Sequence, residues 1–164
     1  MNGGIRSVKK KAIYLTQEGY NRMKEELENL RKKLMYDIAE RIKEARELGD
    51  LSENSEYDEA KNEQGRIDSR IKQLEEILNN AEIIEDDGDM SSVKLGHIVE
   101  LQNMETGERS EFRIVNAQEA NIFEGKISSD SPIGKGVLSH KVDEVVRIKT
   151  PSGWAKYKIL TIGK

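Results

Sequence analysis

The stretch "YNRMKEELENLRKKLMYDIAERIKEAREL", Tyr20 to Leu48, decides the fold of the first half of the chain. Its apolar residues recur at steps of three and four, which is the spacing of one face of an α-helix. They are Tyr20, Met23, Leu27, Leu30, Leu34, Ile38, Ile42, Ala45 and Leu48. The pattern predicts one long helix with a narrow apolar stripe.

The start of this helix is also marked in the sequence. Thr16 can act as its N-cap, with Leu15 and Tyr20 placed to pack together as a hydrophobic staple. We therefore predict a helix from Gln17 to about Leu48, roughly 45 to 50 Å long at about 1.5 Å per residue. Two successive steps of four residues, between positions 34 and 42, form a stutter that locally relaxes a supercoil.

The same period resumes after a polar segment. This second stripe contains Tyr57, Ala60, Gln64, Ile67, Ile71, Leu74, Leu78 and Ala81. Facing residues of an antiparallel hairpin have numbers with a constant sum, and the two stripes pair with a sum of about 105. The pairs are Leu48 with Tyr57, Ala45 with Ala60, Ile38 with Ile67, Leu34 with Ile71, and Leu27 with Leu78. This register predicts an antiparallel coiled-coil hairpin that turns near Ser52 and Glu53.

One position of this predicted seam is polar. Gln64 lies opposite Ile42 in the register above. A polar seam residue can fix the register of a coiled coil. The alternative is that Gln64 is simply exposed near a frayed part of the seam, and the sequence leaves both open.

The turn contains "GDLSENSEYDEA", Gly49 to Ala60, which is rich in carboxylates. Such a cluster is costly unless its members are solvated or meet a cation. One interpretation is structural, because Asp50 and Glu53 have the spacing of a capping box, and Ser52 with Ser55 offers a competing cap. The other is a magnesium site, because Mg²⁺ is often held by one or two carboxylates together with water and substrate phosphates. The remaining ligands would then come from whatever the hairpin is inserted into.

The second half of the chain has a different pattern. The polar segment "EDDGDMSS", residues 85–92, is predicted to be a linker. Two hairpins are predicted beyond it, one from "HIVELQ" and "RSEFRIV" around "METGE", the other from "VVRIKT" and "WAKYKILTI" around "PSG". Between them Ser131 and Pro132 can begin a short helix. We expect an α+β chain with an N-terminal coiled-coil domain (1–84) and a small β-rich domain (93–164).

Composition limits the classes of function. The chain has 164 residues, a net charge of −4 and 35% charged residues, so its bulk charge gives no reason to expect non-specific DNA binding. A nucleic-acid partner would have to be reached locally or through another protein. There is no apolar run long enough for a membrane span and no signal-peptide pattern, so we expect a cytoplasmic protein without a membrane partner. The absence of cysteine excludes disulfides, thiol nucleophiles and cysteine-ligated metals.

Several motif interpretations fail. "SPIGKG" is not a phosphate-binding loop, because Ser129 and Gly136 stand where that loop needs a glycine and a Ser or Thr. His97 and His140 have no partner at metal-ligand spacing, so we expect surface or strand residues. Trp154, at the start of a strand, is expected in the core or as an anchor on a domain surface.

The same residues carry a resemblance to a known family. "GDLSENSEY" at a hairpin tip, followed by "SPIGKG" and "VVRIKTPSG", closely resembles the bacterial transcript cleavage factors of the Gre family, GreA type. The resemblance covers nearly the whole chain in matching order. The first dozen residues are the only part it does not place.

The resemblance implies an accessory factor of bacterial RNA polymerase rather than an independent enzyme. It implies that the C-terminal domain has an FKBP-like fold and docks at the secondary channel, while the coiled coil reaches the active centre and the 3′ end of backtracked nascent RNA. It also implies that Asp50 and Glu53 are the catalytic residues and help to hold a Mg²⁺ ion shared with the polymerase, in line with two-metal chemistry. We expect a monomer. Whether Arg41, Arg46 and Lys61 contact RNA or balance the acids is left open.

Three alternatives are weighed against this interpretation. A related class of factors has the same architecture but inhibits polymerase, and the intact pair Asp50 and Glu53 argues against it. A prolyl isomerase would need an aromatic-lined site, for which this domain offers only Phe112, Phe123, Trp154 and Tyr157. A coiled-coil chaperone would expose apolar tips where this chain has carboxylates.

Overall fold

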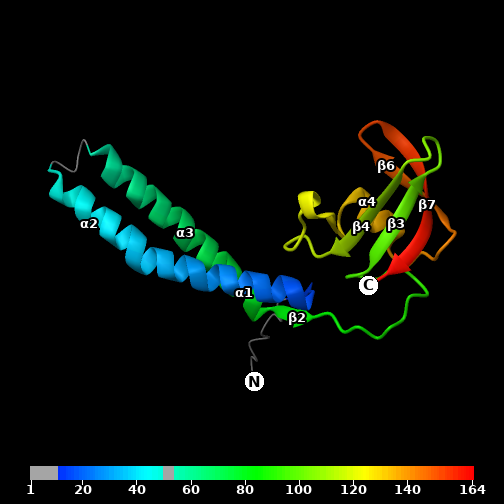
Figure 1. Cartoon of the computed structure of the whole chain (residues 1–164), viewed down its shortest axis with the longest axis horizontal. Coiled ribbons are helices and arrows are strands. Elements are labelled where there is room, and N and C mark those ends of the chain that lie inside the picture. The colour runs from blue at the N-terminus through cyan, green and yellow to red at the C-terminus, as the bar shows by residue number, and fades with distance from the viewer. Residues whose placement is uncertain (1–10, 50–53) are drawn as a thin grey trace, which may run out of the picture. The chain divides into compact units, whose positions relative to one another are not determined.

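The computed structural model describes residues 11–49 and 54–164, which fall into two compact units (Figure 1). The first unit contains Glu18–Ala81. The second unit contains Ile13–Gln17 together with Glu82–Lys164. A short segment that precedes the hairpin in the sequence therefore belongs to the second unit.

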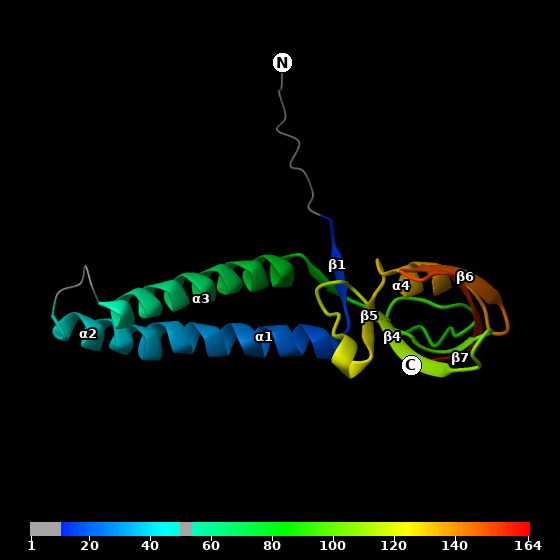
Figure 2. The same ribbon diagram turned by 90° about the horizontal axis from the view of Figure 1, so that it is seen from above.

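The first unit is a helical hairpin, which we call the arm (Figures 1 and 2). Its helices are α1 (Gln17–Lys32), the π-helical segment η1 (Lys33–Ile38), α2 (Ala39–Glu47) and α3 (Ser55–Asn79). The predicted helix from Gln17 to about Leu48 is confirmed, with a π-helical interruption that the sequence analysis did not foresee. A π-helix has more residues per turn than an α-helix, so it accommodates the stutter at this place.

The apolar seam of the arm is buried largely as predicted. Fully or nearly fully buried members are Met23, Leu27, Ile38, Ala45, Ala60, Ile67, Ile71, Leu74 and Ile77. Three assignments were wrong. Ala81 is not in the helical seam, because α3 ends at Asn79 and Ala81 begins the strand β2 (Ala81–Ile83). Leu48 is 69% exposed, because α2 ends at Glu47 and the chain leaves the helical path there. Near the other end of the seam Ile77, which the stripe omitted, is more deeply buried than Leu78.

Ion pairs cross between the two sides of the arm. Arg31 lies 2.8 Å from Glu75, and Glu63 accepts from both Lys33 and Arg41. Hydrogen bonds from Lys33 and then Arg41 lower the pKa of the Glu63 carboxyl. Such exposed pairs contribute little stability. The Arg31–Glu75 and Arg41–Glu63 pairs agree with the predicted register, whereas Lys33 reaches Glu63 from about two turns away.

The polar seam residue does not bond across the seam in the contacts described. Gln64 is half-buried, and its amide oxygen accepts from Lys61 Nζ at 2.8 Å. Both residues belong to α3, so this bond does not specify how the two sides of the arm pair.

The second unit is built on a five-stranded sheet with the order β5-β4-β3-β7-β6. The strands are β3 (Ile98–Asn103), β4 (Arg109–Val115), β5 (Lys126–Ser128), β6 (Val145–Thr150) and β7 (Gly153–Gly163). Both predicted hairpins, β3–β4 and β6–β7, are confirmed as antiparallel pairs. The short strand β5, which pairs in parallel with β4, and the 3₁₀ segment η2 (Ile122–Glu124) were not predicted.

A second, two-stranded sheet was also missed. It pairs β1 (Ile13–Leu15) with β2 (Ala81–Ile83), and Ile84 N donates to Leu15 O at 2.9 Å beside it. Next to β1, Thr16 donates from its backbone N to Glu119 Oε2 at 3.1 Å and from its hydroxyl to Glu119 Oε1. Glu119 is 9% exposed, so this double contact ties Thr16 to the interior of the second unit, to which both residues belong.

The short helix α4 (Pro132–Val137) begins as predicted, with Ser131 as N-cap accepting from Gly134 N at 3.1 Å. It covers the core of the second unit through Val137. A Cβ on Gly134 would lie 2.2 Å from Ser128 O, so the backbone of α4 approaches the end of β5 too closely for any side chain. Packing, not phosphate binding, therefore explains this glycine of "SPIGKG".

Replacing Gly134 by Ala is expected to destabilise the second unit by about 1–3 kcal/mol or more, because the clash is with backbone that cannot rotate away. Gly65→Ala is the matched control. Gly65 lies in α3 with open space around its Cα, so alanine there should stabilise the arm by up to about 1 kcal/mol. Urea unfolding measures both, and equal effects from the two substitutions would contradict the packing described.

Candidate functional site at the arm tip

The predicted site residues Asp50 and Glu53 lie outside the described residues. The structure describes both sides of the segment that contains them. On one side α2 ends and Leu48 and Gly49 follow, and on the other side α3 begins after Asn54. The residues on these two sides show which residue caps α3 and which partners the nearby basic side chains have.

Asn54 fills the capping role. Its Oδ1 accepts from Tyr57 N at 3.1 Å, which makes it the N-cap of α3. Its Nδ2 donates to Ala45 O at 2.5 Å, near the end of α2. One amide side chain thus holds the end of one helix and the start of the next.

The capping interpretation of the tip acids was therefore wrong. Because α3 starts at Ser55 with Asn54 as its cap, neither Asp50 nor Ser52 is the N-cap of this helix. The sequence analysis missed Asn54, although an asparagine three residues before Tyr57 is a usable N-cap signal. The N-cap position of α3 therefore does not require Asp50 or Glu53.

The basic residues near the tip have partners elsewhere on the arm. Arg41 donates to Glu63, and the guanidinium carbon of Arg46 lies 5.9 Å from the centre of the Tyr57 ring. Lys61 bonds to Gln64 as described above. Each of these cations thus has a described partner outside residues 50–53.

Among the described residues, no group of three or more His, Cys, Asp or Glu side chains could hold a metal ion. His97 is buried, and its Nδ1 accepts from Lys94 N at 3.1 Å. His140 does have a carboxylate partner, which the sequence analysis missed, since its Nδ1 lies 2.6 Å from Glu144 Oε2. A single His–carboxylate contact is not a metal site, and the hydrogen bond to His140 lowers the pKa of Glu144.

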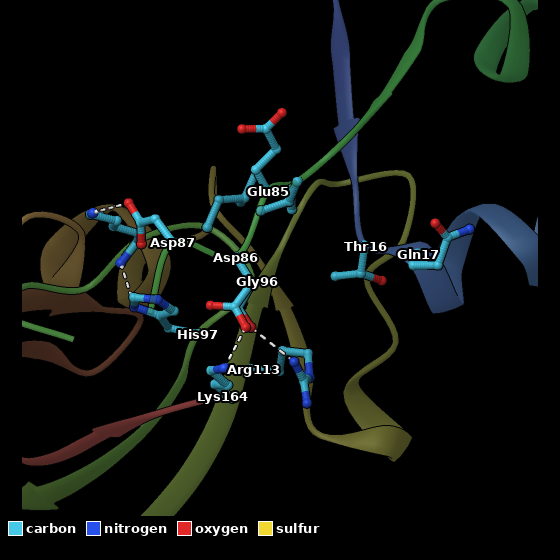
Figure 3. A pocket seen from close by; sticks show the side chains of 12 residues that line it. Thr16, Gln17, Glu85, Asp86, Asp87, Gly96, His97, Arg113 and Lys164 are labelled. Atoms are coloured by element: carbon cyan, nitrogen blue, oxygen red, sulfur yellow. Dashed lines mark hydrogen bonds and ion pairs between the residues drawn. The ribbon is translucent and has the colours of Figure 1, made fainter. Parts of the chain in front are cut away.

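A cavity of about 200 Å³ lies in the second unit (Figure 3). It is smaller than typical ligand pockets. Several of its charged groups bond to one another or to the backbone. Lys164 Nζ lies 2.5 Å from Asp86 Oδ2, and Arg113 donates to Gly96 O at 2.8 Å. The Lys164 bond is the main cause of the lowered pKa of Asp86, and we assign no ligand to this cavity.

Comparison with known proteins identifies the family. Residues 13–83 match the family described as "Transcription elongation factor, N-terminal", and residues 88–164 match "Transcription elongation factor, GreA/GreB, C-term". The chain belongs to the GreA/GreB family of transcription elongation factors. The Gre resemblance drawn from the tip sequence is thereby confirmed.

Individual relatives agree with the Gre assignment. The chain is 57% identical to transcription elongation factor GreA of Thermotoga maritima, over 93% of this chain and 97% of the relative. It is 57% identical to GreA of Thermosipho melanesiensis, over 94% and 99%. Among solved structures, GreA factor homolog 1 (Gfh1) of Thermus thermophilus is 35% identical over 94% of this chain and all of that chain, with a TM-score of 0.43.

No helix among the described residues has the length and apolar character needed to cross a membrane.

Replacing Asn54 by Ala is expected to destabilise the arm by about 1–2 kcal/mol, because one substitution removes the cap of α3 and the bond to Ala45 O. Asn54→Asp separates the two contributions. Aspartate keeps the cap acceptor but has no donor for Ala45 O, so its loss should be smaller. Thermal unfolding followed by far-UV circular dichroism checks the order, and equal stability of all three proteins would show that Asn54 does not hold the tip.

Proposed function

We propose that this Gre-family chain enters the secondary channel of RNA polymerase and stimulates hydrolytic cleavage of the 3′ end of backtracked nascent RNA. The second unit docks on the polymerase, and the arm carries Asp50 and Glu53 to the active centre. The polymerase performs the cleavage with its own active site. The chain is thus an accessory factor that changes the rate of a reaction it does not catalyse alone.

The observation that carries this proposal is the filled cap at Asn54. Two carboxylates near a helix start usually have a structural explanation in capping. Here the N-cap of α3 is Asn54, and the nearby cations have other described partners. Since none of these described contacts requires the acidic pair, we infer that Asp50 and Glu53 serve a ligand from outside the chain.

The donor set of the pair fits Mg²⁺. Carboxylate oxygens are the ligands that Mg²⁺ prefers, and one or two of them are a usual protein share of such a site. Asp50 and Glu53 would hold the ion, with the remaining ligands from the polymerase, the RNA and water. When bound, Mg²⁺ stabilises negative charge on the attacking and leaving oxygens of a phosphodiester.

The chain's own residues have simpler tasks. The arm positions the tip, since its seam and the Asn54 contacts hold the two helix ends together. The carboxylates of Asp50 and Glu53 add negative charge where a cation has to be held, and can accept hydrogen bonds from an attacking water. Two carboxylates on an open tip form too little of a site to cleave RNA alone.

The alternative is a Gre-like inhibitor of the polymerase without cleavage activity. The chain is 57% identical to relatives named transcription elongation factor GreA, which favours the cleavage factor. A prolyl isomerase function is disfavoured because the aromatic side chains of the second unit do not line one common surface. Phe123 is 98% exposed and Trp154 is 59% exposed, whereas Phe112 and Tyr157 pack against the core.

The test is an RNA cleavage assay in stalled, backtracked polymerase complexes. Adding the protein should shorten the 3′-end-extruded RNA much faster than polymerase alone, and the protein without polymerase should leave the RNA intact. Slower cleavage on addition of the protein would identify an inhibitor instead.

A further inference from the structure

The outer face of the β6–β7 hairpin combines positive charge with an exposed tryptophan. In β6 the side chains alternate, with Val146 and Ile148 in the core and Arg147 and Lys149 exposed. Directly opposite residues of an antiparallel pair lie on the same face. Arg147 is opposite Lys156, Lys149 is opposite Trp154, and Val145 is opposite Lys158. We call Arg147, Lys149, Trp154, Lys156 and Lys158 the basic face.

The charge of this face is unusual for the chain. Four cations lie on two neighbouring strands of a protein whose net charge is −4. Lys158 lies 3.9 Å from Asp143. Within the described residues, no ion pair involves Arg147, Lys149 or Lys156. Like charges directly opposite each other, as Arg147 and Lys156 are, destabilise a sheet. An anionic partner would remove that cost.

Trp154 gives the face its second feature. Its side chain is 59% exposed, although tryptophan is on average well buried. The guanidinium carbon of Arg147 lies 5.0 Å from the ring centre, a cation–π contact that holds one side of the ring. The β6–β7 pair lies at one edge of the sheet (Figure 1), where no strand of residues 11–49 or 54–164 other than β7 pairs with β6. A planar group can therefore stack on the remaining exposed surface of the indole.

We propose that the basic face binds single-stranded nucleic acid, with Arg147, Lys149, Lys156 and Lys158 contacting phosphates and Trp154 stacking on a base. Cations that follow the backbone beside an aromatic stacking platform are the shared design of single-strand binders. Alternate residues of a strand stand about 7 Å apart, so the cations form a short row along the hairpin. A duplex would satisfy the cations but offers no free base to the indole. This binding is separate from the chemistry proposed at the arm tip.

The test uses full-length protein and a fluorescein-labelled 20-nucleotide RNA without secondary structure. Binding is measured by anisotropy between 50 and 200 mM salt. Four phosphate contacts predict a log–log salt slope of up to about −2.8, which is roughly a 50-fold loss of affinity across this range. Trp154 is the only tryptophan of the chain, so unlabelled RNA should also quench the intrinsic indole fluorescence.

Variants of the face provide the second part of the test. Lys149→Gln with Lys156→Gln should weaken binding and reduce the magnitude of the slope by about 1.4. Lys24→Gln with Lys32→Gln, both exposed on α1, makes the same charge change away from the face and should leave the slope unchanged. Trp154→Ala should weaken binding roughly tenfold at every salt concentration, while Trp154→Tyr should recover part of the loss.

Three results would overturn the proposal. If the two lysine double variants weaken binding equally, the interaction is not located on the basic face. If poly-glutamate binds as tightly as the RNA and does not change the tryptophan fluorescence, the face recognises an acidic protein surface instead. Tighter binding of a 20-base-pair duplex than of the single strand would equally contradict a stacking role for Trp154.

Discussion

Replacing Asp50 by Asn and Glu53 by Gln is expected to reduce stimulated RNA cleavage by on the order of 100-fold, while the protein still binds polymerase. A loss of this order follows when an electrostatic group of a catalytic site is removed. The fold should be unchanged within roughly 0.5 kcal/mol, because Asn54 and not Asp50 caps α3. The measurement is the single-turnover cleavage rate in backtracked complexes at limiting Mg²⁺.

The matched control for this double variant lies one turn further along. Glu56→Gln with Asp58→Asn removes the same charge from the first turn of α3. These acids interact favourably with the helix N-terminus, so their loss should cost up to about 1 kcal/mol of stability but leave most of the cleavage. Equal loss of cleavage in both variants would show that general negative charge, and not the pair Asp50 and Glu53, is what the tip supplies.

A protein without the arm is expected to compete with the intact protein for polymerase and to give no stimulated cleavage. The core of the second unit, including Val99, Leu101 and Ile159, contains no arm residue. The variant should join Gln17 to Ala81 through a short Gly/Ser linker. That design keeps β1 opposite β2 and keeps Thr16 bonded to Glu119.

Competition binding to polymerase measures the docking of this armless protein, and the backtracked-complex assay measures cleavage. A fragment that starts at Val93 is the informative comparison. It lacks Thr16, so the buried Glu119 carboxylate loses two donors, and we expect a less stable fold by about 1–3 kcal/mol. If the armless protein folds but does not compete, docking requires the arm, and the proposed division of tasks is wrong.

The arm was predictable because its information is periodic and local. Two apolar stripes whose positions also pair in a constant register specify an antiparallel hairpin. The seam residues from Met23 to Ile77 are largely buried, as this register requires. The hairpins of the second unit were predictable for a similar reason, since "METGE" and "PSG" are turn signals between alternating strands. Ser131 and Pro132 likewise marked the start of α4.

The missed features depend on contacts between distant residues. The strand β1 is three residues long, and its partner β2 follows in the sequence only after all the helices of the arm. No local pattern in the sequence predicts such a pair. The bond between Thr16 and Glu119 spans more than a hundred positions. At the tip, local rules gave several competing caps, and the cap observed, Asn54, also makes a bond to Ala45 O that no local pattern shows.

The Mg²⁺ dependence of cleavage tests the role of the tip most directly. Cleavage rates of backtracked complexes should be measured across Mg²⁺ concentrations without the protein, with the protein, and with Asp50→Asn. If the tip supplies metal ligands, the intact protein lowers the Mg²⁺ concentration needed for half-maximal cleavage, and Asp50→Asn raises it again, with partial rescue of the rate at high Mg²⁺. An identical half-maximal Mg²⁺ concentration in all three cases would contradict metal ligation by the arm tip.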